Sequence, residues 1–304
     1  MDLLGTGNSY IELGMIPRIS IVMPVWNGEA YLRAAVDSIL VQTFSDFELL
    51  ALDDGSTDAS VSILESYEDE RIRIIRQGRG GFVKAVNRGV AEARAAWIAR
   101  HDADDVSYPQ RLQKQWEAIQ REPSAVFCYI GIETLGVQER AERQPRLPRS
   151  RALVALKGCF QCPVCVGAGL IKRSTFLEAG GYREEEFPAE DYAFISRIMT
   201  LGNMVGVPQA LYKIRKHESQ ISHVRLESQK LKTRTIAIEN CRQFMQLPAQ
   251  DAERAHAVLV ALPFERRWRD WFWFLIHCAP RLRWKSAELC AWLLSQTMKQ
   301  IAGQ

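Results

Sequence analysis

The stretch ISIVMPVWNGEAYLRAAVDSILVQTFSDFELLALDDGSTDAS, residues 19–60, contains two short apolar runs separated by a helical pattern. The runs at 19–24 and 47–52 predict buried strands. Between them, apolar side chains recur at helical spacing, at Leu32, Val36, Ile39 and Leu40. A strand, a helix and a second strand in this order are typical of a parallel sheet with crossover helices.

The same alternation continues along the chain. Further strands are predicted at 72–75, 96–100, 125–136, from 164 onward and at 205–214, and helices at 81–95, after Pro109 and at 190–202. The segment 139–150 is charged and broken by prolines, which predicts a loop. Beyond residue 224 the pattern is helical alone, at 226–245, 249–262 and 284–300.

The bulk composition excludes several classes of protein. The 304 residues are 47% hydrophobic and 25% charged, as in ordinary globular proteins. The net charge of +3 is too small to indicate a nucleic-acid partner. No window has the roughly 18 to 20 apolar residues of a membrane span, and the N-terminus does not resemble a secretory signal. With seven cysteines that form no regular framework, these features predict a cytoplasmic protein.

Cys159, Cys162 and Cys165 have the C-x2-C-x2-C spacing that can bind an iron–sulfur cluster. No fourth ligand lies nearby, and a strand-like run follows. We therefore favour the interpretation that these cysteines are small buried side chains beside a turn.

Polar side chains follow three of the predicted strands. They occur in PVWNGE (24–29), in DDGSTD (53–58) and in HDADD (101–105). Ligands of open parallel sheets bind beyond the carboxyl ends of the strands, so the three groups predict a shared cleft.

The carboxylates of Asp102, Asp104 and Asp105 are crowded into four residues. One acid could cap the following helix, and DDGSTD alone could be a turn with a helix cap. A cap needs only one acid, however, whereas three carboxylates repel one another unless a cation compensates. Oxygen ligands suit Mg²⁺ or Mn²⁺, and such ions keep positions open for phosphate oxygens.

Several blocks carry a resemblance to a known family. Residues 19–60, the block GGFVKAVNRGVAEARAAWIARHDADDVSYPQRLQKQ and the block GGYREEEFPAEDYAFISRIMTLG together resemble family 2 glycosyltransferases, inverting enzymes of the GT-A fold. The resemblance covers about residues 18–222, in the family's order. It implies an α/β fold: a Rossmann-like, mostly parallel sheet flanked by helices, followed here by a helical C-terminal extension.

The resemblance also implies roles for individual residues. Those bordering the nucleoside are Pro24, Val25, Trp26 and Glu29. One of Asp53 and Asp54 is expected to bind the base, and the sequence does not distinguish them. The D-x-D segment Asp102, Ala103 and Asp104 is expected to hold the metal and the donor diphosphate.

A later acidic pair, Glu190 and Asp191, matches the family's catalytic position, with the aspartate as general base. A carboxylate opposite the leaving group can take the proton of the attacking hydroxyl. The alternative, that both acids complement a helix dipole, stays open.

His217 aligns with a segment that in relatives reaches the diphosphate or the metal, although a loop histidine can also be structural. Two departures concern the donor side: Trp26 replaces the usual tyrosine, and Arg79 replaces an asparagine and could reach phosphate or be exposed. A third lies on the acceptor side, where QCPV (161–164) replaces the usual block.

The segment 264–284 mixes aromatic side chains and arginines. It could pack on the catalytic domain, which we favour slightly, or attach to an anionic membrane surface. The second interpretation would place the protein at the inner face of the plasma membrane, next to a lipid-linked acceptor.

The sequence as a whole predicts a tail (1–15), a GT-A domain (16–222) and a helical extension (223–304). Within the GT-A domain, the nucleotide-sugar half is expected at about 16–136 and the acceptor half at about 150–222. The predicted function is metal-dependent, inverting transfer from a nucleotide-diphosphate sugar, expected to be a UDP-sugar, to a hydroxyl of a glycan or lipid-linked acceptor in cell-surface polysaccharide synthesis.

Two alternatives remain. A nucleotidyltransferase would need a basic, glycine-rich loop after the first strand, where PVWNGEAYL has one glycine and no lysine. A non-catalytic relative would be expected to lose the acidic pairs, which are all present.

Overall fold

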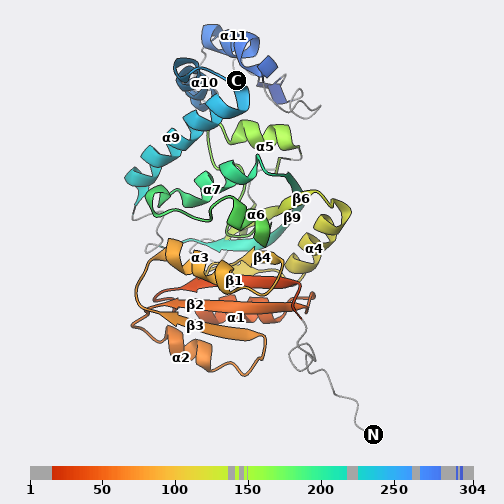
Figure 1. Cartoon of the computed structure of the whole chain (residues 1–304), viewed down its shortest axis with the longest axis vertical. Helices are drawn as coiled ribbons and strands as arrows, with labels where there is room; N and C mark the ends of the chain where they lie inside the picture. The colour runs from red at the N-terminus through yellow and green to blue at the C-terminus, as the bar shows by residue number, and fades with distance from the viewer. Residues whose placement is uncertain are drawn as a thin grey trace.

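The computed structural model describes residues 16–135, 141–143, 147–148, 150–217, 225–261 and 268–281, and the pairs 292–293 and 295–296. Its core element is one mixed sheet whose main path runs β3-β2-β1-β4-β8-β6-β9-β5, with β7 paired to β6. Helices cover the sheet, and the C-terminal helices stack at one end of the molecule (Figure 1).

The N-terminal half is the parallel part of the sheet. Its strands are β1 (Ile19–Val25), β2 (Phe47–Asp54), β3 (Ile72–Gln77) and β4 (Trp97–Arg100), and its helices are α1 (Leu32–Leu40), α2 (Ser60–Glu65) and α3 (Phe82–Glu92). The register pairs Val25 with Asp53, and Asp53 with Arg76. The polar residues that follow these strands therefore meet at one edge, as the sequence predicts.

The second half adds shorter and antiparallel pieces. Its strands are β5 (Val106–Ser107), β6 (Ala125–Leu135), β7 (Ala141–Arg143), β8 (Leu170–Lys172) and β9 (Asn203–Arg215), and its helices are α4 (Arg111–Arg121), α5 (Arg151–Lys157), α6 (Arg173–Glu178) and α7 (Glu190–Ile198), with a 3₁₀ turn η1 (Glu184–Glu186) before α7. β8 runs antiparallel to both β4 and β6, whereas β6 and β9 are parallel.

Two segments differ from their sequence-based predictions. The strand expected from residue 164 is only the three residues of β8, because Gly169 closes a turn onto Val166 and lies against the Phe127 ring. A Cβ at Gly169 would lie 2.3 Å from that ring, so only glycine fits. The loop expected at 139–150 contains β7, which extends the hydrogen bonds of β6.

Successive side chains of β1 and β2 point to opposite faces of the sheet, and they belong to two apolar clusters, one on each face. Val22 and Leu50 belong to the first cluster, and Ile21 and Leu49 to the second. Both faces are buried, which explains why these strands read as continuous apolar runs.

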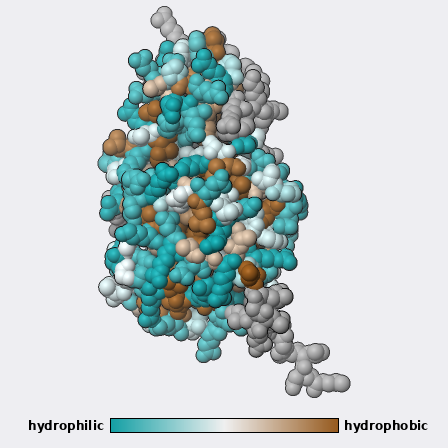
Figure 2. Space-filling view, in the orientation of Figure 1, coloured by the Kyte–Doolittle hydropathy of each residue, from teal (hydrophilic) through white to brown (hydrophobic). Residues whose placement is uncertain are grey.

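The C-terminal helices are α9 (Leu226–Met245), α10 (Ala249–Ala261) and α11 (Trp268–His277), followed by a 3₁₀ turn η2 (Ala279–Arg281). Most of the helix predicted at 284–300 lies outside the described residues. None of the described helices is long and apolar enough to cross a bilayer. On the face drawn in Figure 2, hydrophilic side chains predominate and apolar ones form scattered patches.

Candidate active site

The loop after β1 is held to the loop after β2 by reciprocal hydrogen bonds. The Glu29 carboxylate accepts from the backbone N–H of Ala59 at 2.9 Å, and the Glu29 N–H donates to Asp58 at 3.0 Å. Asn27, in the left-handed region at φ 49°, accepts from the backbone N–H of Thr57. Glu29 therefore stabilises the start of α2, a role that its sequence position alone does not reveal.

Trp26 forms an exposed wall at the end of β1, which Pro24 and the buried Val25 complete on the strand side. Half of the Trp26 side chain is exposed, and the Arg79 guanidinium lies 3.7 Å from the centre of its ring. This stacking is a cation–π contact. Trp26 and Arg79, the two residues that depart from the family's pattern on the donor side, are therefore in contact.

Asp53 and Asp54 are both buried at the end of β2 but have different partners. Asp53 Oδ1 accepts from the Ser56 N–H at 3.0 Å. Asp54 accepts from Gln77 Nε2 at 2.7 Å, from the N–H groups of Gly80 and Gly81, and from Arg79. Burial acts to raise the pKa of Asp54, yet these hydrogen bonds hold it below its usual value. Asp54 thereby organises the loop after β3.

The strand β4 delivers Arg100 and the acidic turn. Arg100 is 3% exposed, and its Nη2 donates to Asp102 Oδ1 at 2.6 Å. Its Nε and Nη1 atoms have no hydrogen-bond partner, and the guanidinium lies against the rings of Phe82 and Tyr182. The sequence offered one signal for it: a charged residue at the end of an otherwise apolar strand.

Asp102 and Asp104 reach the surface on either side of Ala103, with about a third of each carboxylate side chain exposed. The removal of Asp102 from water and repulsion by Asp104 and Asp191 outweigh the attraction of Arg100, and together they raise the pKa of Asp102 to about 6. Gly167 is packed closely against the Asp102 carboxylate, since a Cβ at position 167 would lie 2.6 Å from Asp102 Oδ2.

Asp105 points inward and ties the turn to β9. Its Oδ1 accepts from the Arg215 N–H at 2.9 Å, and it is 3% exposed. Burial and the neighbouring charges of Asp102 and Asp104 raise its pKa to about 8. Asp105 therefore connects the acidic turn to β9 through this hydrogen bond.

His217 follows β9 and returns to the acidic turn. Its Nε2 lies 2.8 Å from Asp104 Oδ2, and its ring packs on Tyr31 at 5.0 Å between centres. His217 thus lies beside one of the two aspartates that are expected to hold the metal.

Glu190 and Asp191 form the first turn of α7. Tyr182 donates its hydroxyl hydrogen to Asp191 Oδ1. Glu190 is 8% exposed with Oε2 unpartnered, and burial together with the Asp191 charge raises its pKa to about 8. Burial and the adjacent Asp191 raise the pKa of Tyr182 as well. Arg100 links the two acidic groups, because its Nη2 donates to Asp102 Oδ1 and its guanidinium lies 5.8 Å from the centre of the Tyr182 ring, whose hydroxyl donates to Asp191.

The residues of this site suit a hard divalent cation in their donor chemistry. Two partly exposed carboxylates are ligand types for Mn²⁺ or Mg²⁺, and a cation would offset the repulsion that raises the pKa of Asp102. Within the described part of the chain, no three His, Cys, Asp or Glu side chains are grouped as a metal site. The expected ligands Asp102, Asp104 and His217 therefore do not form a preassembled triad.

The cysteines of the C-x2-C-x2-C segment are free thiols. Cys159 is fully buried in the first apolar cluster, and burial raises its pKa well above the usual value. Cys162 and Cys165 lie near Asp191, whose charge adds to the burial that raises their pKa values.

Comparisons with known proteins identify a matching family model and several sequence relatives. The family model described as "Glycosyl transferase family 2" matches residues 20–179. "Glycosyltransferase GlyG" of Streptococcus pneumoniae is 33% identical over 227 residues, covering 67% of this chain and 72% of its own. "O-antigen biosynthesis glycosyltransferase WbnJ" of Escherichia coli is 30% identical over 198 residues, covering 62% and 74%.

Solved structures share the fold. Staphylococcus aureus TarS 1-349 in complex with UDP-GlcNAc aligns with a TM-score of 0.64 and 19% identity, over 93% of this chain and 80% of that one. The mannosyltransferase PcManGT from Pyrobaculum calidifontis, in complex with GDP-Man and Mn²⁺, aligns with a TM-score of 0.56 and 13% identity, over 95% and 88%.

Proposed function

Because this chain belongs to glycosyl transferase family 2, and is therefore a glycosyltransferase, we propose that it transfers a sugar from a nucleotide-diphosphate sugar to a hydroxyl of a glycan or lipid-linked acceptor. We propose inversion at the anomeric carbon and dependence on Mn²⁺ or Mg²⁺. The observation that carries this proposal is the chain of contacts from Asp102 through Arg100 and Tyr182 to Asp191, with Asp104 on the same turn as Asp102. Family membership weighs against the nucleotidyltransferase and non-catalytic alternatives.

On the donor side, Trp26 supplies a flat apolar wall for a nucleoside, and Asp53 is the better candidate to bind the base. Asp54 already accepts four hydrogen bonds, whereas Asp53 accepts one that leaves its second oxygen available. Arg79, stacked on Trp26, is placed to contact a base or a phosphate. The UDP and UDP-GlcNAc complexes of TarS favour a UDP-sugar.

Asp102, Asp104 and His217 would hold the cation and, through it, the diphosphate. A bound cation supplies Lewis acidity that stabilises the departing diphosphate. Arg100 keeps Asp102 oriented through its 2.6 Å hydrogen bond, and Gly167 leaves room for the carboxylate. Asp105 fixes the turn that carries both ligands.

On the acceptor side, Asp191 takes the proton of the attacking hydroxyl. Tyr182 donates to Asp191 Oδ1 and so orients the carboxylate, leaving Oδ2 for the acceptor. The neighbouring Glu190, whose pKa is raised to about 8, is mostly protonated near pH 7 and can donate a hydrogen bond to acceptor or donor oxygens.

We place the reaction in cell-surface polysaccharide synthesis, with the protein in the cytoplasm or at the inner face of the plasma membrane. The name of the O-antigen relative supports the pathway class. In the described part of 264–284, Phe274 and Cys278 pack in the core, which favours packing of α11 over full insertion in a membrane. Ile276 of α11 is exposed, and we propose that it is available for a peripheral contact with a membrane surface.

The test is thermal stabilisation by UDP-, GDP- and dTDP-sugars with and without Mn²⁺. A ligand at 100 times its Kd stabilises the native state by about 2.7 kcal/mol. We expect a UDP-sugar to stabilise the protein, and Asp104→Asn to abolish the part that depends on Mn²⁺. Failure of every nucleotide sugar to stabilise the wild-type chain would contradict the proposal.

A further inference from the structure

We propose that helix α9 positions the catalytic base, so that the C-terminal helices are part of the catalytic unit. This inference rests on the proposed role of Asp191. It identifies Gln229 and Asn240 as positioning residues that act through the segment carrying Glu190 and Asp191.

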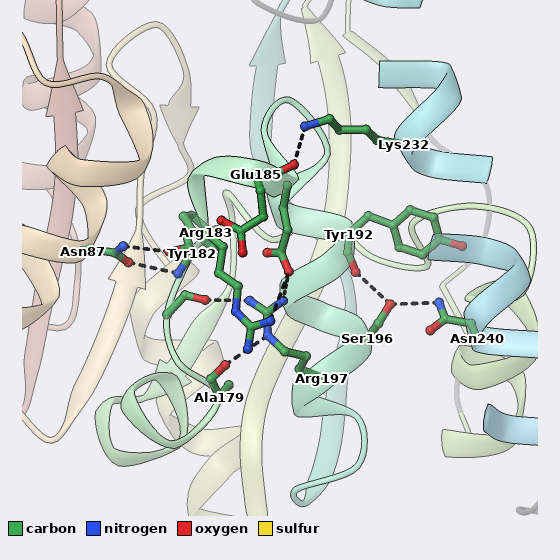
Figure 3. A network of polar contacts seen from close by, with 12 residues as sticks. Asn87, Ala179, Tyr182, Arg183, Glu185, Tyr192, Ser196, Arg197, Lys232 and Asn240 are labelled. Carbon is green, nitrogen blue, oxygen red and sulfur yellow. Dashed lines mark hydrogen bonds and ion pairs between the residues drawn. The ribbon is translucent and has the colours of Figure 1, made fainter. Parts of the chain in front are cut away.

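The first half of α9 holds the chain just before α7. Gln229 Nε2 donates to the Pro188 carbonyl at 2.9 Å. Lys232 Nζ donates to the Glu185 carbonyl, as Figure 3 shows. The Arg225 guanidinium, at the start of α9, lies 5.5 Å from the centre of the Phe187 ring. These contacts fall within six residues of Asp191, and the two hydrogen bonds are to main-chain carbonyls, so they fix the path of the backbone that leads into it.

The second half of α9 holds the body of α7. Asn240 Nδ2 donates to Ser196 Oγ at 2.8 Å and to the Gly158 carbonyl at 2.6 Å. Ser196 in turn donates to the Tyr192 carbonyl, and the Tyr192 hydroxyl donates to Gly158 at 2.5 Å. Figure 3 shows Tyr192, Ser196 and Asn240 in a row between the two helices. Asn240 is 2% exposed, so both of its amide hydrogens are used inside the protein.

The opposite side of the base is anchored to the donor half of the site. Asn87 on α3 exchanges two hydrogen bonds with the backbone of Tyr182, at 2.8 and 3.0 Å. Tyr182 then donates to Asp191. Asp191 is therefore positioned from two sides. Asn87 of α3 acts through Tyr182, and Gln229 and Asn240 of α9 act through the segment that leads into α7 and through α7 itself. Loss of the α9 side would let α7 shift, and a displacement of about 1 Å at a reacting group can slow catalysis about 100-fold.

The experiment compares Gln229→Met, which removes the donor, with Gln229→Lys, which keeps one. Gln229 is only partly buried, so neither variant is expected to unfold the chain. Arg242→Ala is the matched control, because Arg242 lies on the same helix in an exposed ion pair with Glu239. Asn240→Leu is a second probe, at the buried contact. Hydrogen exchange of residues 184–198 is measured in the full ligand-free chain, followed by turnover of the nucleotide sugar found in the thermal screen.

We expect faster exchange of 184–198 in Gln229→Met and Asn240→Leu, and wild-type exchange in Gln229→Lys and Arg242→Ala. In the first two variants kcat should fall about tenfold while the KM for the donor changes less than about twofold, since the contacts orient the base and do not bind the donor. Unchanged exchange in Gln229→Met, or an equal kcat loss in Gln229→Lys, would overturn the inference. If Asp191→Asn were fully active, the assigned base would be wrong, but the exchange measurement would still decide whether α9 holds α7.

Discussion

Arg100 is the side chain through which the acidic groups of the site meet. Its guanidinium donates to Asp102 and lies against Tyr182, the partner of Asp191. Of the six buried side-chain atoms without a hydrogen-bond partner in the described chain, two belong to Arg100 and one each to His101 and Glu190. Unpaired buried polar atoms are rare in native proteins, and their concentration here marks the place where substrate is expected to bind.

Gly167→Ala tests how closely Asp102 is confined. The new Cβ would lie 2.6 Å from Asp102 Oδ2, so the carboxylate must move. We expect the Mn²⁺ concentration for half-maximal activity to rise about tenfold, with little change in the unfolding free energy. Gly78→Ala is the control, because nothing lies within 4 Å of its Cβ. Equal Mn²⁺ dependence in both variants would mean that Gly167 does not matter to the cation.

Glu190 makes stability depend on pH. Its pKa is about 8 in the folded chain against an ordinary value of 4.5, so the folded state binds more protons between these values. The unfolding free energy should therefore fall as pH rises from 4.5 to 8, by up to about 1.4 kcal/mol per pH unit. Glu190→Gln should make this decline less steep in denaturation curves of the metal-free protein, and the raised pKa values of Asp105 and Asp102 account for the part that remains. A decline of the same slope in the variant would assign it to other groups.

The sequence singled out candidate acids for the site but did not indicate what each one contacts. The crowding of Asp102, Asp104 and Asp105 indicated a cation, yet the inward turn of Asp105 onto Arg215 depends on β9, about 110 residues away. Tyr182 and Gly167 were not predicted because their roles arise from long-range packing, and the one local signal for Arg100, a charge at the end of an apolar strand, does not reveal its partners.

At the scale of elements, the ends of β1, β2 and β4 create the donor side because parallel register brings them to one edge. Hydrophobic periodicity predicted these strands to within a few residues. It failed at β8, where glycines allow a close approach to Phe127 that only the folded neighbours reveal. The helix pattern at α9 was correct, but its polar contacts to α7 were not predictable from amphipathicity.

The variants Asp53→Asn and Asp54→Asn distinguish a residue that binds the nucleotide sugar from one that holds the loop after β3 in place. Asp54 accepts four hydrogen bonds, so its replacement should lower the unfolding free energy by about 1–3 kcal/mol. Asp53→Asn should instead weaken stabilisation by the nucleotide sugar while the free chain stays near wild-type stability. Chemical denaturation and thermal shift measure the two effects. If Asp54→Asn lost only nucleotide binding, the assignments would be reversed.

At the scale of the whole molecule, one apolar cluster joins the sheet to the C-terminal helices. It includes Val22 and Leu50 of the sheet as well as Phe244, Leu259 and Phe274 of the extension. We propose the division into a GT-A domain at 16–222 and an extension at 223–304 as a boundary along the chain only, because the two parts share a core.

Removal of residues 223–304 tests this shared core. The truncated chain would expose the face of α5 and α7 that α9 covers, so we expect aggregation or loss of near-ultraviolet circular dichroism. The full chain should unfold in one transition by tryptophan fluorescence and far-ultraviolet circular dichroism. A monomeric, cooperatively folding 16–222 fragment would show instead that the extension is dispensable for folding.

The most direct test of the account is turnover by Asp191→Asn with the nucleotide sugar and Mn²⁺ identified by thermal shift, measured as nucleoside diphosphate released with a panel of glycan acceptors. The account predicts a loss of about 10²- to 10⁴-fold, as for removal of a general base, with donor stabilisation unchanged. Wild-type turnover by Asp191→Asn would contradict it.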